Sequence, residues 1–172
     1  MASLMENLIE VLGQESEEYE GLLALSQKKT RIIASANLED LQKITDDEQE
    51  VVGRIARLEK KRTEVTADIA NVLNKDVEEL KLSNLIVMMS PRPQEQGKLT
   101  EYHDRLRSAA QELRRVNEQN KELLENALEM VEFEMNLLQA SKAAPETANY
   151  TKSAYSSGVQ MGVASGNFDA KQ

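Results

Sequence analysis

The sequence predicts an all-α protein: three long antiparallel helices in an elongated bundle or coiled coil, with a short connecting helix and a C-terminal tail. Apolar residues recur at spacings of three and four over three long stretches, as on one face of an α-helix. Aromatic residues make up only 3% of the chain and charged residues 30%, which suits narrow interhelical seams better than a thick globular core. We therefore expect a bundle over residues 1–143 and a flexible partner-binding tail over residues 144–172.

The first helix is predicted over residues 3–35. Its apolar stripe contains Leu4, Leu8, Leu12, Tyr19, Leu22 and Ile33, with interruptions at Glu15, Ser26 and Lys29. Asn37 follows as an N-cap, and Asp40 lies in the first turn of the next helix. Because only two or three residues separate the helices, we expect an antiparallel hairpin.

The second helix is predicted over residues 38–73, with seam positions that alternate in steps of four and three residues. These positions are Ile44, Glu48, Val51, Ile55, Leu58, Arg62, Val65, Ile69 and Val72. A connector over residues 74–97 follows, in which Asp76 would start a short helix. Pro91 and Pro93 end that helix, and Gly97 closes the loop.

The third helix is predicted over residues 98–143 and has the clearest pattern. Its seam is Leu99, Tyr102, Leu106, Ala109, Leu113, Val116, Asn120, Leu123, Ala127, Met130, Glu134, Leu137 and Ser141. Such a long helix cannot bury its seam against itself. It must lie along the first two helices or along another chain.

Polar residues at seam positions include Glu15, Glu48, Arg62, Asn120 and Glu134. One interpretation is that they fix the register of the helices, since polar seam residues reject slipped pairings at a cost in stability. The other is that parts of the seam stay open for a partner. The hairpin also predicts that Glu15 lies within about one helical turn of Arg62.

The composition argues against several classes of function. Without cysteine, and with His103 as its one histidine, the chain can assemble neither a cysteine-based zinc site nor a Ser-His-Asp triad. We expect His103 to be an exposed helical residue, and we expect no enzyme activity, cofactor or metal. The net charge of −9 disfavours nucleic acid. No apolar run is long enough to span a membrane, and a cytoplasmic protein is expected.

The tail changes in composition, since no leucine or isoleucine follows Leu138. Its larger apolar residues are spaced among serine, alanine and glycine, which favours docking onto a partner over an incidental disordered terminus. Alternation around Gln160 would also permit strand addition to a partner's sheet. The candidate contacts are Tyr150, Tyr155, Val159, Met161, Val163 and Phe168.

The order of four motifs resembles the FlgN-like flagellar export chaperones. They are Glu18-Tyr19 followed by residues 22–25 and Lys28-Lys29; residues 37–41 with Ile44 and Asp47-Glu48; residues 117–120 leading into Leu123-Leu124; and residues 155–158 with a closing Tyr-x-x-Gly. The resemblance implies a cytoplasmic chaperone that binds the helical terminal segment of hook-associated (hook-filament junction) proteins. Such a chaperone prevents premature assembly and delivers its substrate to the type III export apparatus.

The resemblance also implies that the end of the third helix and the tail, including Gly158, bind the substrate, and that Tyr150 or Tyr155 contacts the export apparatus. Leu128, Val131 and Leu138 widen the apolar face of the third helix, so we expect charged substitutions there to weaken binding more than folding. The alternative is a structural coiled-coil adaptor that oligomerises through the third helix. The free protein is expected to be a monomer or a weak homodimer.

Overall fold

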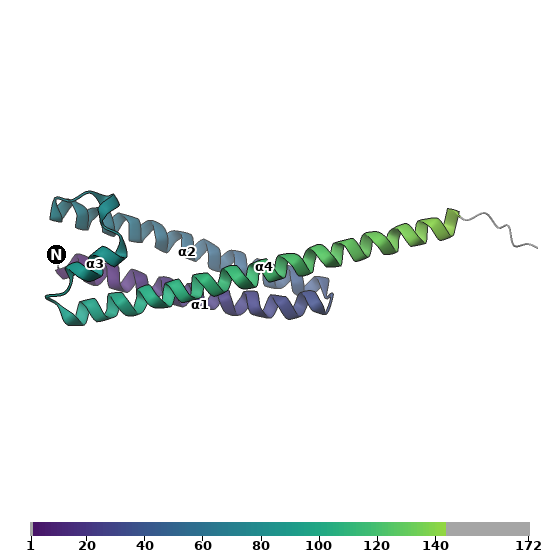
Figure 1. Cartoon of the computed structure of the whole chain (residues 1–172), viewed down its shortest axis with the longest axis horizontal. Helices are drawn as coiled ribbons and strands as arrows, with labels where there is room; N and C mark the ends of the chain where they lie inside the picture. The colour runs from purple at the N-terminus through teal and green to yellow at the C-terminus, as the bar shows by residue number, and fades with distance from the viewer. Residues whose placement is uncertain (1, 144–172) are drawn as a thin grey trace, which may run out of the picture. The chain divides into compact units, whose positions relative to one another are not determined.

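The computed structural model describes residues 2–143, and every regular element among them is helical. In chain order these are α1 (Ala2–Ala34), α2 (Leu38–Leu73), the 3-10 helix η1 (Val77–Glu79), α3 (Leu82–Met88) and α4 (Pro93–Ala143) (Figure 1). The all-α class and the bundle of long helices are therefore confirmed. Backbone contacts divide the chain into two units, Met1–Leu128 and Glu129–Gln172. The predicted boundary at residues 143 and 144 falls where the description ends and stays a prediction.

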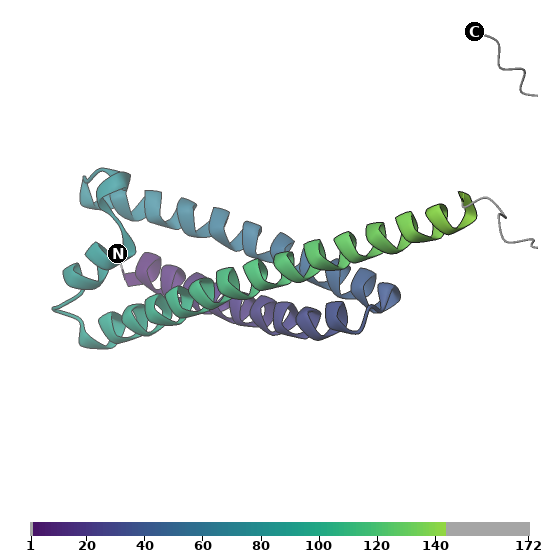
Figure 2. The same cartoon turned by 45° about the vertical axis from the view of Figure 1, so that its right-hand side comes forward.

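Helices α1 and α2 form the predicted antiparallel hairpin, and their backbones run close together (Figure 2). Ala36 takes a left-handed conformation with φ of 53°, which reverses the chain between them. The side-chain oxygen of Asn37 then accepts a hydrogen bond of 3.1 Å from the backbone N–H of Asp40. This bond satisfies one of the free donors at the start of α2 and confirms the predicted N-cap.

Helix α2 ends at Leu73, as predicted, and the connector after it contains two short helices instead of one. Asn74 follows in the left-handed conformation (φ 51°, ψ 45°), which tightly terminates the helix. Asp76 precedes η1, but its side chain makes no capping hydrogen bond. The α-helical turns begin only at Leu82.

The predicted start of the third helix at residue 98 is wrong, because α4 begins at Pro93. Proline suits the first turn of a helix, where its fixed φ is helical and its missing N–H is not needed. The backbone N–H of Gln96 already bonds to the carbonyl oxygen of Arg92 at 3.0 Å. Gly97 lies inside the helix, where an added Cβ would meet no atom within 4 Å apart from its chain neighbours and the backbone of its own helix, so no turn requires glycine there.

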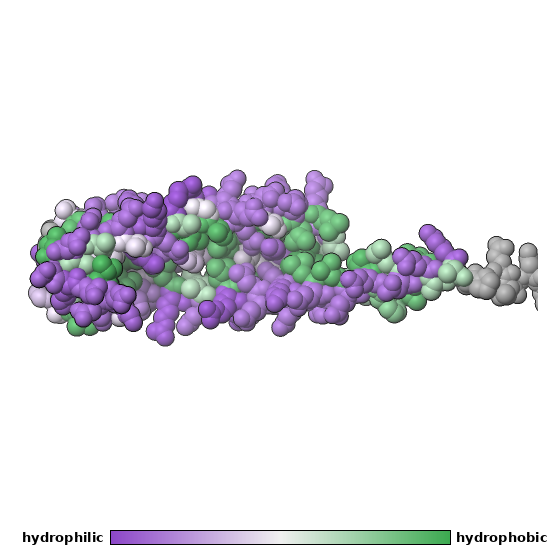
Figure 3. Space-filling model, turned by 90° about the horizontal axis from the view of Figure 1, so that it is seen from above, coloured by the Kyte–Doolittle hydropathy of each residue, from purple (hydrophilic) through white to green (hydrophobic). Residues whose placement is uncertain are grey.

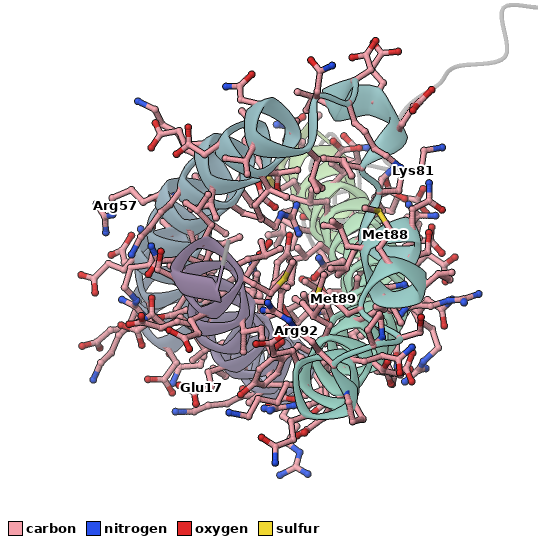
Figure 4. All side chains as sticks on the ribbon, turned by 90° about the vertical axis from the view of Figure 1, so that its left-hand side faces the viewer. Glu17, Arg57, Lys81, Met88, Met89 and Arg92 are labelled. Carbon is pink, nitrogen blue, oxygen red and sulfur yellow. The ribbon has the colours of Figure 1, made fainter. Side chains whose placement is uncertain are left out.

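The main core lies at the connector end of the first unit, where α3 joins the three long helices. Leu80, Leu85 and Met89 of the connector are buried in it. Figure 4 shows this end of the bundle, with Met89 among the helices while Glu17 and Arg57 point outward. The buried members of this core are Met5, Leu8, Ile9, Leu12, Val65, Ile69, Ala70, Leu80, Leu85, Met89 and Leu99. A smaller cluster is formed by Leu22, Val51, Ile55 and Leu113.

Candidate partner-binding surface

The seam of α4 is buried or half-buried along its first half and exposed along its last part. Val116 is 2% exposed and Asn120 4%, whereas Leu128 is 64% exposed and Leu138 62%. Helix α4 has 51 residues, against 33 in α1 and 36 in α2, so two shorter helices cannot cover its whole seam. The heptad pattern of α4 therefore continues beyond the residues that the bundle buries.

The exposed apolar surface of α4 includes the three helical residues that the sequence singled out, Leu128, Val131 and Leu138. Four further apolar residues of this segment are exposed. Met130 and Leu137 belong to the seam that the sequence predicts, whereas Phe133 and Met135 lie outside that seam. Spacings of three and four residues, from Met130 to Phe133 and on to Leu137, were the signal that was missed. Figure 3 shows hydrophobic side chains on this part of α4 beside hydrophilic ones.

The predicted tail contacts lie outside the described residues. These are Tyr150, Tyr155, Gly158, Val159, Met161, Val163 and Phe168. Their assignment stays a prediction.

The polar surface of the same helical segment is acidic. Glu129, Glu132 and Glu134 are exposed, and none of them forms an ion pair with another described residue. No lysine or arginine occurs from residue 122 to residue 141. The segment therefore offers hydrophobic side chains and carboxylates, and a partner with apolar and basic side chains complements both.

A closed polar layer crosses the bundle at Asn120, about two helical turns before Leu128 in α4. Asn120 accepts a hydrogen bond of 2.6 Å from Thr30 Oγ1 and donates one of 2.9 Å to the carbonyl oxygen of Ser26. Glu48 accepts hydrogen bonds of 2.8 Å from Ser26 Oγ and from Lys29 Nζ. Because these groups satisfy one another, this part of the seam is not open to a partner, which favours the register interpretation for Asn120 and Glu48.

The predicted proximity of Glu15 and Arg62 is confirmed by an ion pair of 3.1 Å between Glu15 Oε1 and Arg62 Nη1. The Glu15 side chain is 1% exposed, and its Oε2 has no hydrogen-bond partner among the described residues. Burial raises the pKa of Glu15, Arg62 partly offsets that rise, and nearby Glu59 adds to it. Tyr19 donates a hydrogen bond of 2.7 Å to Glu59 Oε1, and burial together with this bond raises the pKa of Tyr19 to about 12.

These titratable groups do not form a recognisable catalytic or metal site in the part of the chain that the structure describes. His103 is half-buried rather than fully exposed, and it pairs with Asp104 at 3.0 Å. Residues 2–143 contain no cluster of three His, Cys, Asp or Glu side chains arranged to hold a metal ion. Within the same range, no helix is both long and apolar enough to cross a membrane. The exposed part of α4 is therefore the strongest candidate site.

Comparison with known protein families gives a match that covers most of the chain. The family model described as FlgN protein matches residues 1–157. Searches of curated proteins and of solved structures give no match. The match includes all the described helices and the first part of the predicted tail.

Proposed function

Because the chain belongs to the FlgN family of flagellar export chaperones, we propose that it binds the helical terminal segment of hook-associated proteins, which join the flagellar hook to the filament. The observation that carries this proposal is the exposed apolar surface of α4 around Leu128, Val131 and Leu138. An amphipathic helix of the substrate packs its apolar stripe against this surface. The substrate's stripe is then covered and cannot start premature assembly.

The chaperone needs no chemistry for this role, because helix packing is reversible. Covering an apolar side chain the size of leucine contributes about 1.5–3 kcal/mol, so a few such contacts give a stable but releasable complex. The complex forms in the cytoplasm, and the export apparatus supplies the energy for release. Tyr150 and Tyr155 are both candidates for contact with that apparatus, while the rest of the tail extends the substrate-binding surface.

The test is a binding titration of the full-length chain with a purified hook-filament junction protein. We expect Leu128→Glu, Val131→Glu and Leu138→Glu each to weaken binding by about tenfold or more, since each removes one apolar contact and adds charge. Leu38→Glu is the matched control, because Leu38 is 79% exposed at the start of α2. We expect all four variants to keep the melting temperature of the parent, because the four residues are exposed. A failure to bind the junction protein, or equal losses of binding and thermal stability, contradicts the proposal.

The tail is tested separately in the full chain. The combined change Val159→Ser, Met161→Ser and Val163→Ser is expected to weaken substrate binding. Tyr150→Ala and Tyr155→Ala are compared for substrate export in cells and for substrate affinity. The variant that lacks the tyrosine in contact with the export apparatus should export less substrate while its affinity for the substrate is unchanged. If the triple variant binds normally and both tyrosine variants export normally, the tail has neither role.

A structural adaptor that dimerises through α4 is the second candidate, since the same exposed side chains suit self-association. Light scattering on the chain alone separates the two. A stable dimer that Leu128→Glu dissociates favours the adaptor. A monomer that forms a defined complex with the junction protein favours the chaperone.

A further inference from the structure

The seven exposed apolar side chains of residues 128–138 fall in two seams on different sides of α4. Seam A contains Leu128, Val131, Met135 and Leu138, and seam B contains Met130, Phe133 and Leu137. In both seams the steps alternate between three and four residues. At about 100° of rotation per residue, the centres of the two seams lie about 145° apart around the helix.

One partner helix cannot cover both seams. A helix that packs against one neighbour presents an apolar stripe roughly 100° wide, and a helix that is apolar on more sides has neighbours on more sides. Resting on the proposed function, we infer that the substrate places two helical segments against α4, one on seam A and one on seam B. Residues 128–138 then become the middle helix of a three-helix arrangement with the substrate.

Both helical segments belong to one substrate molecule. Seam B has only three large side chains, and this contact is too small to offset the translational freedom that a separate molecule loses on binding. A second segment tethered to one already bound on seam A does not pay that cost again, because its effective concentration is high. The geometry therefore predicts a complex of one chaperone and one substrate.

The carboxylates between the seams specify the charge of the two segments. Glu129 and Glu132 lie on one side between seam A and seam B, and Glu134 lies on the other. Each bound helix consequently has carboxylates at its edges, and lysine or arginine at the edges of the substrate helices complements them. A second copy of this chain is a poor occupant, since its own glutamates would face these glutamates.

The first experiment measures the affinity of the full-length chain for a junction protein in seam variants. The variants are Leu128→Ser with Leu138→Ser for seam A, and Met130→Ser with Phe133→Ser for seam B. The matched control, Asn136→Ser with Gln139→Ser, changes two exposed uncharged residues of the same helix that belong to neither seam. We expect each seam variant to bind at least tenfold more weakly and the control to bind within about twofold of the parent. Circular dichroism verifies that helix content is equal in all of them.

The second experiment places a photo-crosslinking residue at Val131 or at Phe133 and identifies the substrate peptides that are captured. We expect each position to capture a different helical segment of the substrate, in a complex of one chaperone and one substrate molecule. The two-segment inference is overturned if both positions capture the same segment. It is also overturned if the seam B variant binds normally while the seam A variant does not. Either result leaves the proposed function intact. Normal binding by both seam variants overturns the proposed function as well. Dimerisation of the chain alone through the two seams would also refute the inference.

The charge of the substrate helices is tested with Glu129→Gln combined with Glu132→Gln. We expect this variant to bind more weakly than the parent at low salt, with a smaller dependence of affinity on salt concentration. An unchanged salt dependence would show that the substrate does not present basic side chains to this strip.

Discussion

Asn120 provides the most direct test of the polar layer inside the bundle. Asn120→Ala removes the hydrogen bonds to Thr30 Oγ1 at 2.6 Å and to the carbonyl oxygen of Ser26 at 2.9 Å. A typical intramolecular hydrogen bond contributes about 1 kcal/mol net. Thr30 Oγ1 still has the carbonyl oxygen of Ser26 at 3.2 Å, so its hydroxyl keeps an acceptor and adds no further penalty. We therefore expect the free energy of unfolding to fall by about 2 kcal/mol.

Urea unfolding followed by circular dichroism measures this loss, and the melting temperature should fall by about 4–8 °C for a chain of this size. Asn117→Ala is the matched control, since Asn117 is exposed three residues earlier on α4. Its effect should stay within about 0.5 kcal/mol. A double-mutant cycle of Asn120→Ala with Thr30→Val isolates the bond between the two side chains, with an expected coupling of about 1 kcal/mol. Equal stability of the Asn120 and Asn117 variants, or a coupling near zero, would refute the reasoning.

Three further predictions concern the body of the bundle. Burial raises the pKa of Glu15 in the folded chain above its ordinary value of 4.5. Between the ordinary pKa and the raised pKa, the folded chain therefore holds a proton that the unfolded chain has lost. The contribution of Glu15 to stability consequently falls as the pH rises through this range. Glu15→Gln should remove that part of the pH dependence in urea titrations at several pH values, and an unchanged slope contradicts the raised pKa. Tyr19→Phe deletes the hydrogen bond to Glu59 and should cost about 1 kcal/mol in the same assay, whereas no measurable loss would mean that the bond is not formed in solution. Leu85→Ala should cost about 2–5 kcal/mol, because Leu85 is 1% exposed in the main core; a loss like that of an exposed residue would show that α3 is not held there.

The sequence predicted well those features that depend on residues close together in the chain. The cap at Asn37 depends on one side chain and the backbone three residues later, and the end of α2 depends on the left-handed backbone at Asn74. The proximity of Glu15 and Arg62 followed from counting turns along a tight antiparallel hairpin, and the structure shows that the two side chains form an ion pair. The start of α4 was misplaced because Pro93 was interpreted as a breaker, although proline also begins helices.

The candidate site was predicted only in part, because periodicity does not say which neighbour covers a seam. Val116 and Leu137 belong to the same heptad series, yet the first is buried and the second is exposed. Phe133 and Met135 lie outside the main series and were overlooked for that reason.

By itself, the sequence determined the all-α class, the three long helices and their polar seam positions, since helical period and caps depend on residues three or four positions apart. Only the tertiary structure decided which part of the α4 seam stays exposed and that the apolar side chains on both sides of residues 128–138 are left uncovered. It also decided that Glu15 lies buried with one carboxylate oxygen unpaired among the described residues. The physical reason is that burial depends on segments far apart in the chain, whose packing no local pattern specifies.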